Sequence, residues 1–526
     1  MSAQQPIPVF DSLAAIYPSK VAVLRESQRW NALVDKFTQA YGSSPSHIIR
    51  APGRVNILGE HIDYSLFPVL PAAIEQDILI ALRPTSTSRV RLSNVSPSFK
   101  SADFNQTPPN DDNGEWHVDF VSPKDGGKWD NYVKVALAEG LAEYFKGGKS
   151  RLGVEPRGME LMVSGTVPPG AGLSSSAAFV VASMITFLTA NDLSENITKG
   201  DIVAMAMASE HRMGLNSGGM DQAASALCIA NSILHLSFFP HLDTQSVPLP
   251  SNLAIIITNS LAAHELTASA PRHYNLRVVE MQCATRLLIH AWGLSDHSRV
   301  KGNVGKEGRL WLREALEMWN SGCDEEMLYH RAIEQSYRIL GSEGRDRKGW
   351  TRQEMIAESG MSASAFTQTY LDFLEVEADH FHLHARVLHS LKESLRVLRF
   401  ASICQNLASS GQASENDTRV FELGALLNAS HDSCQHVYDC TAIETDSLKD
   451  LCLANGAIGS RQTGGGWGGA VVSLVPVGKA QEFLDSIKKK YPLYRGLGED
   501  ALNGAAFATL PGSGAGIYLV KGDIKG

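Results

Sequence analysis

The sequence predicts an α+β protein with more than one domain, and the order of its strand and helix patterns supports this prediction. Short apolar strands alternate with helices over the first half of the chain. Residues from about 275 to 455 instead follow a helical, charge-rich pattern, and a strand pattern returns at 470–475. At roughly 100–200 residues per domain, a chain of 526 residues corresponds to about two to four domains.

The domain boundary is placed near residue 245, where the mixed pattern ends. This gives an N-terminal domain, residues 1–245, and a C-terminal domain, residues 246–526. The second domain carries extra helical material near 295–390.

Apolar periodicity and turn residues predict the individual elements in order. The predicted elements are strands at 78–82 and 90–92, a long surface loop at 100–128, a helix at 129–145, a strand at 159–163, helices at 175–190 and 202–213, a buried strand at 254–258, a strand at 470–475 and a helix at 480–490.

Composition and charge exclude several classes of protein. The net charge of −9 argues against a nucleic-acid-binding surface. The longest apolar runs, such as Leu253–Ile257, are far shorter than the ~18–20 residues that span a bilayer, and no signal peptide is visible. The seven cysteines form no CxxC pair, which favours reduced thiols in the cytoplasm.

The segment Gly165–Ala178 combines glycine, proline and serine where a predicted strand enters a loop that opens a helix. Gly170 and Gly172 allow the backbone to approach a ligand closely. The helix N-terminus offers unpaired N–H groups to phosphate, and the hydroxyls of Ser174–Ser176 add further ligands. The loop has no lysine, so it is no Walker A motif, and Ser175 replaces the third glycine of a dinucleotide fingerprint. We predict a phosphate-binding loop; a glycine-rich turn with a serine cap is the alternative.

The segment Arg50–Tyr64 gathers charged side chains that suit a sugar. Sugar hydroxyls need donors and acceptors at fixed positions, which carboxylates and arginine provide. Arg54, Glu60, His61 and Asp63 are the candidates. A metal site or a solvated turn are the alternatives for this segment.

Two further acids flank a glycine turn. Glu210 lies near a predicted helix end, and Asp221 follows Gly218-Gly219. One acid can hold Mg²⁺, which prefers oxygen ligands, and the other can orient or deprotonate an attacking hydroxyl. Taken singly, either acid is more often a surface or capping residue.

Taken together, three segments resemble the signatures of galactokinases in the GHMP kinase superfamily. Gly53–Tyr64 is similar to the galactokinase signature, Pro169–Ala178 to the phosphate loop and Gly459–Gly469 to the C-terminal glycine motif. Trp129–Tyr132 and Tyr274–Arg277 match further family stretches. The resemblance extends from about residue 30 to the end, and the chain length and extra helices resemble fungal galactokinases.

The resemblance implies a two-domain GHMP kinase fold with the active site in the interdomain cleft. It implies transfer of the γ-phosphoryl group of MgATP to the C1 hydroxyl of α-D-galactose, the first committed step of galactose catabolism. Phosphoryl transfer depends on alignment and charge neutralisation more than on covalent chemistry.

The family pattern also assigns roles to residues of this chain. The catalytic pair is Asp221, which would accept the hydroxyl proton, and Arg54, which would keep that acid ionised. The implied sugar site comprises Arg54, Glu60, His61, Asp63, Asn216, Gly218, Gly219, Asp221 and Tyr274. The implied ATP site comprises Gly170, Ala171, Gly172, Leu173, Ser174, Ser175 and Ser176, with Trp129 and Tyr132 beside the adenine. Ser176 and Glu210 match the Mg²⁺ ligands.

Two departures from the family pattern limit this transfer of roles. Fungal relatives often carry Asn-Asn where this chain has Asn216-Ser217, and the shorter Ser217 could lose or reroute a sugar contact. Relatives often carry Ser-Asn-Lys where this chain has His264-Glu265-Leu266, so a nucleotide contact from that lysine is not expected.

Three other interpretations stay open. Some fungal paralogues bind galactose and ATP but act as transcriptional inducers through a repressor; the complete Ser174–Ala178 run favours an enzyme without excluding a repressor as partner. A kinase for N-acetylgalactosamine is a second alternative. A metal site is a third, with ligands from Glu377, His380, His382, His384 and His389.

Overall fold

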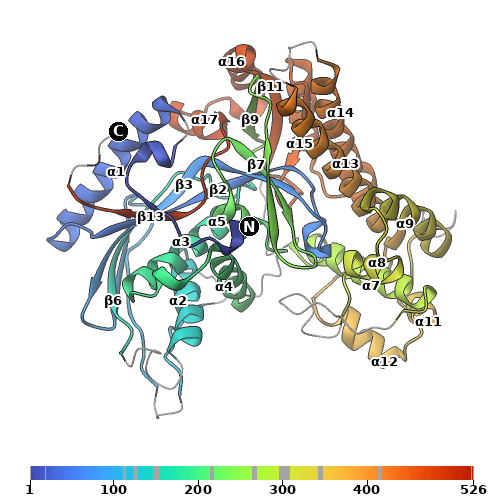
Figure 1. The fold of residues 1–526 in the computed structure, drawn as a ribbon, viewed down its shortest axis with the longest axis horizontal. Helices are drawn as coiled ribbons and strands as arrows, with labels where there is room; N and C mark the ends of the chain where they lie inside the picture. The colour runs from blue at the N-terminus through green and yellow to red at the C-terminus, as the bar shows by residue number, and fades with distance from the viewer. Residues whose placement is uncertain are drawn as a thin grey trace.

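The structure is a computed structural model of the chain. It describes residues 2–17, 19–109, 114–121, 128–145, 154–213, 218–262, 269–294, 309–341, 348–410, 417–522 and 524. Figure 1 shows two lobes. The first is built on the larger sheet, and the second consists mostly of helices from the second half of the chain.

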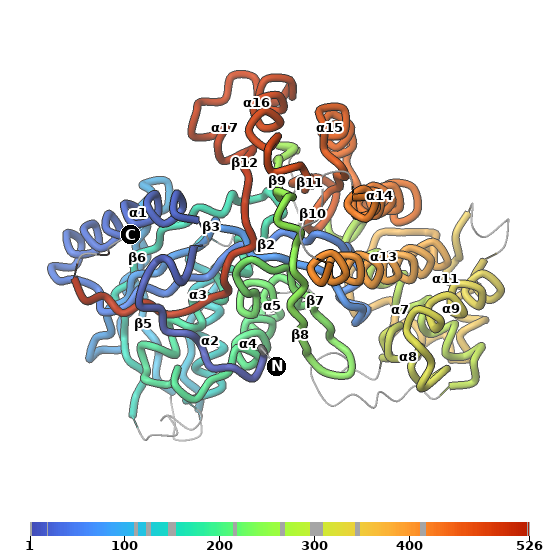
Figure 2. Tube along the Cα trace, turned by 45° about the horizontal axis from the view of Figure 1, so that its top comes forward, coloured from blue at the N-terminus to red at the C-terminus, as the bar shows by residue number. Residues whose placement is uncertain are grey.

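The larger sheet of the described part of the chain has seven strands in the order β1-β13-β2-β3-β6-β4-β5. Its strands are β1 (Val9–Phe10), β2 (His47–Leu58), β3 (Leu70–Thr85), β4 (Arg89–Asn94), β5 (Ala102–Asn105), β6 (Gly158–Gly165) and β13 (Gly516–Leu519). Neighbouring strands are antiparallel except for the pairs β1–β13 and β4–β6. Strand β13 comes from the end of the chain, which therefore returns to the first lobe (Figure 2).

The two faces of this sheet are covered by different helices, because successive side chains of a strand point to opposite faces. Ile48 and Leu79 pack with Trp30 of α1 (Lys20–Tyr41) on one face. Ile49 and Ile80 belong to the larger core on the other face. The helices of that face are α2 (Asn131–Tyr144), α3 (Ser175–Ala190), α4 (Lys199–Arg212) and α5 (Met220–Leu227). Helix α3 is central, and every residue from Ala177 to Ala190 is buried, as its apolar sequence requires.

The second sheet has the order β10-β11-β9-β12 and is antiparallel. Its strands are β9 (Leu253–Asn259), β10 (Gly459–Thr463), β11 (Ala470–Pro476) and β12 (Ala506–Thr509). A separate hairpin is formed by β7 (Ser232–Ser237) and β8 (Asp243–Pro248). The boundary expected at residue 245 lies within β8, and the division of the chain at this residue stays a prediction.

The remaining helices belong mostly to the second lobe (Figures 1 and 2). They are α7 (Tyr274–Ala291), α8 (Leu312–Trp319), α9 (Glu325–Leu340), α11 (Arg352–Glu358), α12 (Ala363–Phe366), α13 (Leu383–Ser409), α14 (Thr418–Ser433), α15 (Ile443–Ala454), α16 (Ala480–Lys490) and α17 (Glu499–Ala505). Short helical turns are η1 (Ser2–Gln4), η2 (Leu13–Ala15), η3 (Asp63–Ser65), η5 (Ser194–Asn196), η6 (Thr367–Leu371), η7 (Cys434–Tyr438), η8 (Val477–Lys479) and η9 (Pro492–Tyr494).

Most predicted elements are confirmed within a few residues. Strand β3 begins at Leu70, well before the predicted strand at 78–82. Two other elements differ for identifiable reasons. Helix α4 begins earlier than predicted, because Thr198 and Asp201 form a capping box that starts it at Lys199. The predicted loop 100–128 contains the edge strand β5, whose pairing with β4 includes an Arg89–Asp103 ion pair. No helix in the described part of the chain is both long and apolar enough to cross a bilayer.

Candidate active site

The glycine-serine loop connects β6 to α3, as predicted, and its backbone has the conformation that its glycines permit. Gly170 and Gly172 both have φ +71°, and Ser174 is left-handed at φ +57°. Ser174 makes no side-chain cap to the helix, so the predicted serine cap is not formed. The N-terminal N–H groups of α3 therefore have no cap from the Ser174 hydroxyl, as an anion-binding helix start requires.

The C-terminal glycine motif packs directly against this loop. A Cβ on Gly172 would lie 2.9 Å from the carbonyl oxygen of Thr463, and a Cβ on Gly464 would lie 2.4 Å from the carbonyl oxygen of Gly172. Two backbones this close leave no room for side chains. The end of β10 therefore helps to fix the glycine-serine loop. This contact joins the two lobes.

Arg54 and Asp221 lie together, as the sequence predicts for the catalytic pair. Arg54 extends from β2 and is 3% exposed, and Asp221 is the second residue of α5. The Arg54 Nε donates to Oδ1 of Asp221 at 2.8 Å, and Nη2 lies 2.7 Å from the same oxygen. Arg54 also donates from Nη1 to the carbonyl oxygen of Gly172 at 2.6 Å. One guanidinium thus contacts both the acid and the phosphate loop.

The turn after β2 presents Glu60 and His61 in an uncommon backbone conformation. Gly59 has φ +109°, and His61 has φ +58°. The carboxylate of Glu60 is buried, and its Oε1 accepts hydrogen bonds from the N–H of Gly464 at 3.0 Å and from Nη1 of Arg461 at 3.3 Å. Burial raises the pKa of Glu60, and the Arg461 charge opposes this rise. The His61 Nε2 is buried without a hydrogen-bond partner.

Asp63 opens η3 and packs against the Gly218-Gly219 turn. A Cβ on Gly218 would lie 2.3 Å from Oδ2 of Asp63, so a side chain does not fit there. Burial and the neighbouring charge of Asp221 raise the pKa of Asp63 to about 7, although backbone N–H groups stabilise its carboxylate. Asp63 and Asp221 are therefore close enough for their charges to interact.

An aromatic cluster surrounds His61; it consists of His61, Tyr64, Tyr274, Tyr438 and Trp467. Ring centroids lie 5.6 Å from His61 for Tyr274, 5.1 Å for Tyr438 and 5.5 Å for Trp467. Burial, followed by the charges of Asp63 and Asp221, raises the pKa of Tyr274 well above its ordinary value. The predicted Tyr274 is thus close to the acids of the site.

The residues predicted beside the adenine form a second aromatic group. Trp129 lies just before α2, and its ring is parallel to that of Phe179 in α3, with 6.0 Å between centroids and 9° between planes. Tyr132 also contacts Phe179, at 5.8 Å. Phe179 was not predicted. A planar base could stack on rings of this kind.

The predicted metal ligands are chemically suited to Mg²⁺. Ser176 is the second residue of α3, and Glu210 is a buried acid in the last turn of α4. Both offer the oxygen atoms that Mg²⁺ prefers, and the two helices pack together. The predicted sugar residue Asn216 and the departures at Ser217 and His264-Glu265-Leu266 lie outside the described residues.

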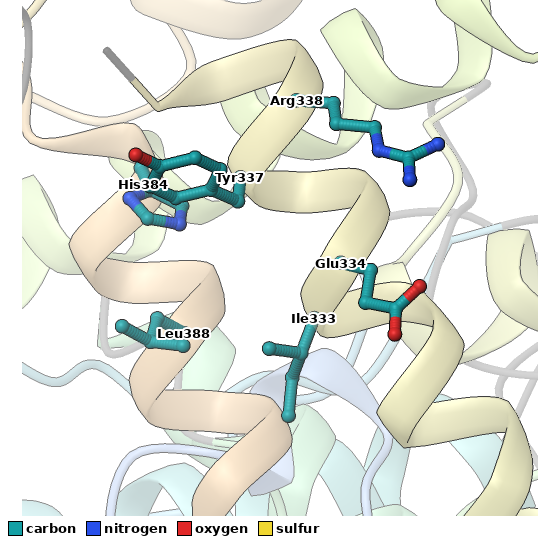
Figure 3. Close-up of a pocket in the computed structure, with 6 residues that line it drawn as sticks. All are labelled: Ile333, Glu334, Tyr337, Arg338, His384 and Leu388. Atoms are coloured by element: carbon teal, nitrogen blue, oxygen red, sulfur yellow. The ribbon is translucent and has the colours of Figure 1, made fainter.

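The alternative histidine metal site is not assembled. The ring nitrogens of His389 are occupied by Glu60 and Ser433, and Glu377 pairs with Arg272. No three His, Cys, Asp or Glu side chains of the described residues form a group that could hold a metal. His384 instead lines a pocket of about 370 Å³ between α9 and α13 (Figure 3). None of the residues predicted for the sugar, ATP or Mg²⁺ sites lines this pocket.

Sequence reasoning missed several residues that hold the site. Arg461 and Gly464 fall within the glycine motif, but no role was predicted for them. Glu393 and His389 contact the backbone of the Gly59-Glu60 turn from α13. The sequence offered His389 only as a ligand of the alternative metal site, and nothing in it distinguishes Glu393 from the rest of a long helix.

Comparison with known proteins agrees with this geometry. Three family models match: the galactokinase galactose-binding signature at residues 35–84, the N-terminal domain of GHMP kinases at 131–228 and their C-terminal domain at 417–493. A galactokinase of Dictyostelium discoideum is 34% identical, over 92% of this chain and 91% of that protein. A galactokinase of Saccharomyces cerevisiae is 32% identical, over 97% and 98%.

A solved structure confirms the predicted fold class. The crystal structure of Lactococcus lactis galactokinase complexed with galactose superposes with a TM-score of 0.64 at 22% identity, over 93% of this chain and 99% of that chain. The family expected from the three motifs is likewise confirmed by the full-length similarity. The chain belongs to the galactokinase family of GHMP kinases.

Proposed function

We propose that this protein transfers the γ-phosphoryl group of ATP to the C1 hydroxyl of α-D-galactose, giving α-D-galactose 1-phosphate and ADP. The observation that supports this most strongly is the position of Arg54. Its guanidinium contacts Asp221 on one side and the phosphate loop at Gly172 on the other. In such a transfer, the γ-phosphoryl group moves from ATP held on the phosphate loop to a sugar hydroxyl held by the acid.

The chemistry follows from this arrangement. The C1 oxygen attacks the γ-phosphorus, the bond from that phosphorus to the β–γ bridging oxygen breaks, and ADP leaves with the electron pair. Asp221 accepts the hydroxyl proton or orients the hydroxyl for attack. Arg54 holds Asp221 in place through its hydrogen bond and offsets negative charge on the transferring group. Alignment of the two substrates supplies much of the rate enhancement.

The phosphates of ATP would rest on the backbone of the Gly170–Ser176 loop and the N-terminus of α3. Adenine would stack beside Trp129 and Tyr132. Ser176 and Glu210 would hold Mg²⁺, which would neutralise phosphate charge.

Galactose recognition is assigned to Glu60, His61, Asp63 and Tyr274. The unpartnered Nε2 of His61 provides one buried polar atom for a sugar hydroxyl. Galactose and glucose differ at C4, and a site that hydrogen-bonds one hydroxyl orientation leaves buried groups unpaired with the other. Discrimination of this kind reaches about 10⁴–10⁵-fold in favourable cases.

A coupled ADP-release assay on a panel of sugars tests this proposal. Galactose should support turnover, glucose should be rejected, and the product should carry phosphate at C1 by NMR. Absence of turnover with galactose despite binding of galactose and ATP would indicate a sensor of the inducer type. Preference for N-acetylgalactosamine would contradict the substrate assignment.

A further inference from the structure

We propose that His389 and Glu393 of α13 are positioning residues of the sugar site, which hold the Gly59-Glu60 turn in its sugar-binding conformation. This inference rests on the proposed function for the identity of the sugar. Neither residue belongs to the motifs that mark the family in this chain.

The side chains of His389 and Glu393 lie on one face of α13, and both form hydrogen bonds to the backbone of the Gly59-Glu60 turn. His389 and Glu393 are four residues apart, so they project on the same side of α13. The Nε2 of His389 lies 3.0 Å from the carbonyl oxygen of Glu60. Oε1 of Glu393 accepts a hydrogen bond from the N–H of Gly59 at 3.0 Å. A donor and an acceptor thus fix consecutive residues of the turn.

The hydrogen-bond partners define the protonation state of His389. A carbonyl oxygen only accepts, so Nε2 must carry a hydrogen. The ring is neutral, because burial lowers the pKa of His389 to about 4. The Nδ1 atom therefore accepts from the hydroxyl of Ser433 at 2.9 Å. The Ser433 hydroxyl thereby holds the ring in the orientation that the turn requires.

The carboxylate of Glu393 is also fixed by several hydrogen bonds. It is fully buried, and its carboxylate also accepts from Ser430 Oγ at 2.6 Å and from Nη1 of Arg396 at 2.6 Å. Burial raises the pKa of this acid, but the charges of Arg396 and Arg461 outweigh burial and lower it to about 2. The carboxylate therefore stays ionised and acts only as an acceptor.

The turn needs such support because its backbone is strained. A non-glycine residue with positive φ, such as His61 at +58°, persists where its surroundings impose that conformation. The same turn carries Glu60 and His61, which are proposed sugar contacts, and Oε1 of Glu60 is fixed separately by Arg461 and Gly464. Helices α7 and α9 pack against α13. Helices α7 and α9 thereby support the face of α13 that contacts the Gly59-Glu60 turn of the first lobe.

The test compares His389→Phe with His389→Gln. Phenylalanine keeps the ring volume but removes the donor, whereas glutamine places an amide N–H close to the position of Nε2. For His389→Phe we expect KM for galactose to rise about 5- to 100-fold, as for loss of a buried hydrogen bond, while KM for ATP stays within about twofold. His389→Gln should restore KM for galactose to within about threefold of wild type.

Hydrogen exchange of the free protein gives a second readout that needs no turnover. His389→Phe should speed exchange of the amides of residues 56–62, whereas Ser394→Ala, a buried change on the same helix without a hydrogen bond to the turn, should not. If His389→Phe does not fold, Ser433→Ala takes its place, with an expected rise in galactose KM of about two- to tenfold.

Unchanged galactose KM together with unchanged exchange would overturn the proposal, as would equal rises in both KM values. A wild-type protein that does not phosphorylate galactose would contradict the proposed function instead. In that case the exchange experiment still decides whether α13 holds the turn.

Discussion

Arg54 and Asp221 form an ion pair in which Nε of the arginine donates to Oδ1 of the acid at 2.8 Å. The same guanidinium donates to the carbonyl oxygen of Gly172 at 2.6 Å. Because a guanidinium is a rigid fork of donors, it fixes the acid and the phosphate loop relative to each other. Most of the proposed chemistry depends on this connection.

Asp221→Ala should abolish turnover while galactose binding survives. Loss of a general base typically costs about 10²–10⁴ in rate, and misalignment of the hydroxyl adds to this loss. Steady-state kinetics and calorimetric titration with galactose measure the two effects separately. A kcat close to that of wild type would remove Asp221 from the catalytic role.

Gly172→Ala should destabilise the free protein more than Gly170→Ala. Both glycines have φ +71°, so both variants carry a left-handed strain of about 1–2 kcal/mol. A Cβ at Gly172 also meets Thr463 O at 2.9 Å, whereas nothing lies within 4 Å at Gly170. This overpacking adds about 1–3 kcal/mol. Urea unfolding measures the difference, and equal losses would show that the loop does not pack on β10 as described.

Galactose affinity should depend on pH through Asp63, whose pKa is raised to about 7. The ionised carboxylate is the form that accepts hydrogen bonds from sugar hydroxyls. The ionised fraction falls from about nine-tenths at pH 8 to about one-tenth at pH 6, so KM for galactose should rise roughly tenfold over that range. Asp63→Asn should raise KM and flatten its pH dependence. If Asp63→Ala left KM for galactose unchanged, Asp63 would not bind the sugar.

Ionisation of Asp63 should favour galactose binding but lower the stability of the folded protein. The pKa of Asp63 is higher in the folded state than its ordinary value of 3.8, so its contribution to stability is present at low pH and is lost as pH rises toward and through 7. Asp63→Asn removes the cost of an ionised buried acid and should raise Tm above that of wild type at pH 8. A lower Tm for this variant at pH 8 would contradict that expectation.

His389 should make the protein sensitive to mild acid. Burial lowers its pKa from 6.5 to about 4 despite the favourable charge of Glu393, and Arg396 and Arg461 add to the lowering. The unfolded chain therefore binds more protons than the folded one between about pH 6.5 and 4, so stability is lost as pH falls through that window. His389→Gln should reduce the slope of the unfolding free energy against pH in this range. An unchanged slope would mean that His389 is not buried as a neutral ring.

Local motifs could be read from the sequence because their chemistry lies within a few consecutive residues. Gly170, Gly172 and the serines after them identify a helix start suited to phosphate whatever the rest of the fold. Apolar periodicity likewise predicted α3 and β9 closely, since each is buried along most of its length. Strand β5 was missed because it is a short edge strand with alternate residues exposed.

Long-range pairing could not be read in the same way. His389 bonds to the Glu60 carbonyl across 329 positions, and its helix sequence is typical of any long amphipathic segment. From the sequence it was only a candidate ligand of an alternative metal site, whereas the structure pairs it with Ser433 of α14 and with Glu60 in the turn after β2. The return of β13 to the first sheet also depends on a distant segment, because its partners β1 and β2 lie at the opposite end of the chain.

The most direct test is a crystal structure with galactose and a non-hydrolysable ATP analogue bound together. We expect the phosphates on the Gly170–Ser176 loop and the galactose beside Glu60, His61 and Asp63. The C1 hydroxyl should lie within hydrogen-bond distance of Asp221 and face the γ-phosphoryl group. Phosphates bound away from that loop, or galactose bound away from those three side chains, would contradict the assignment of the active site.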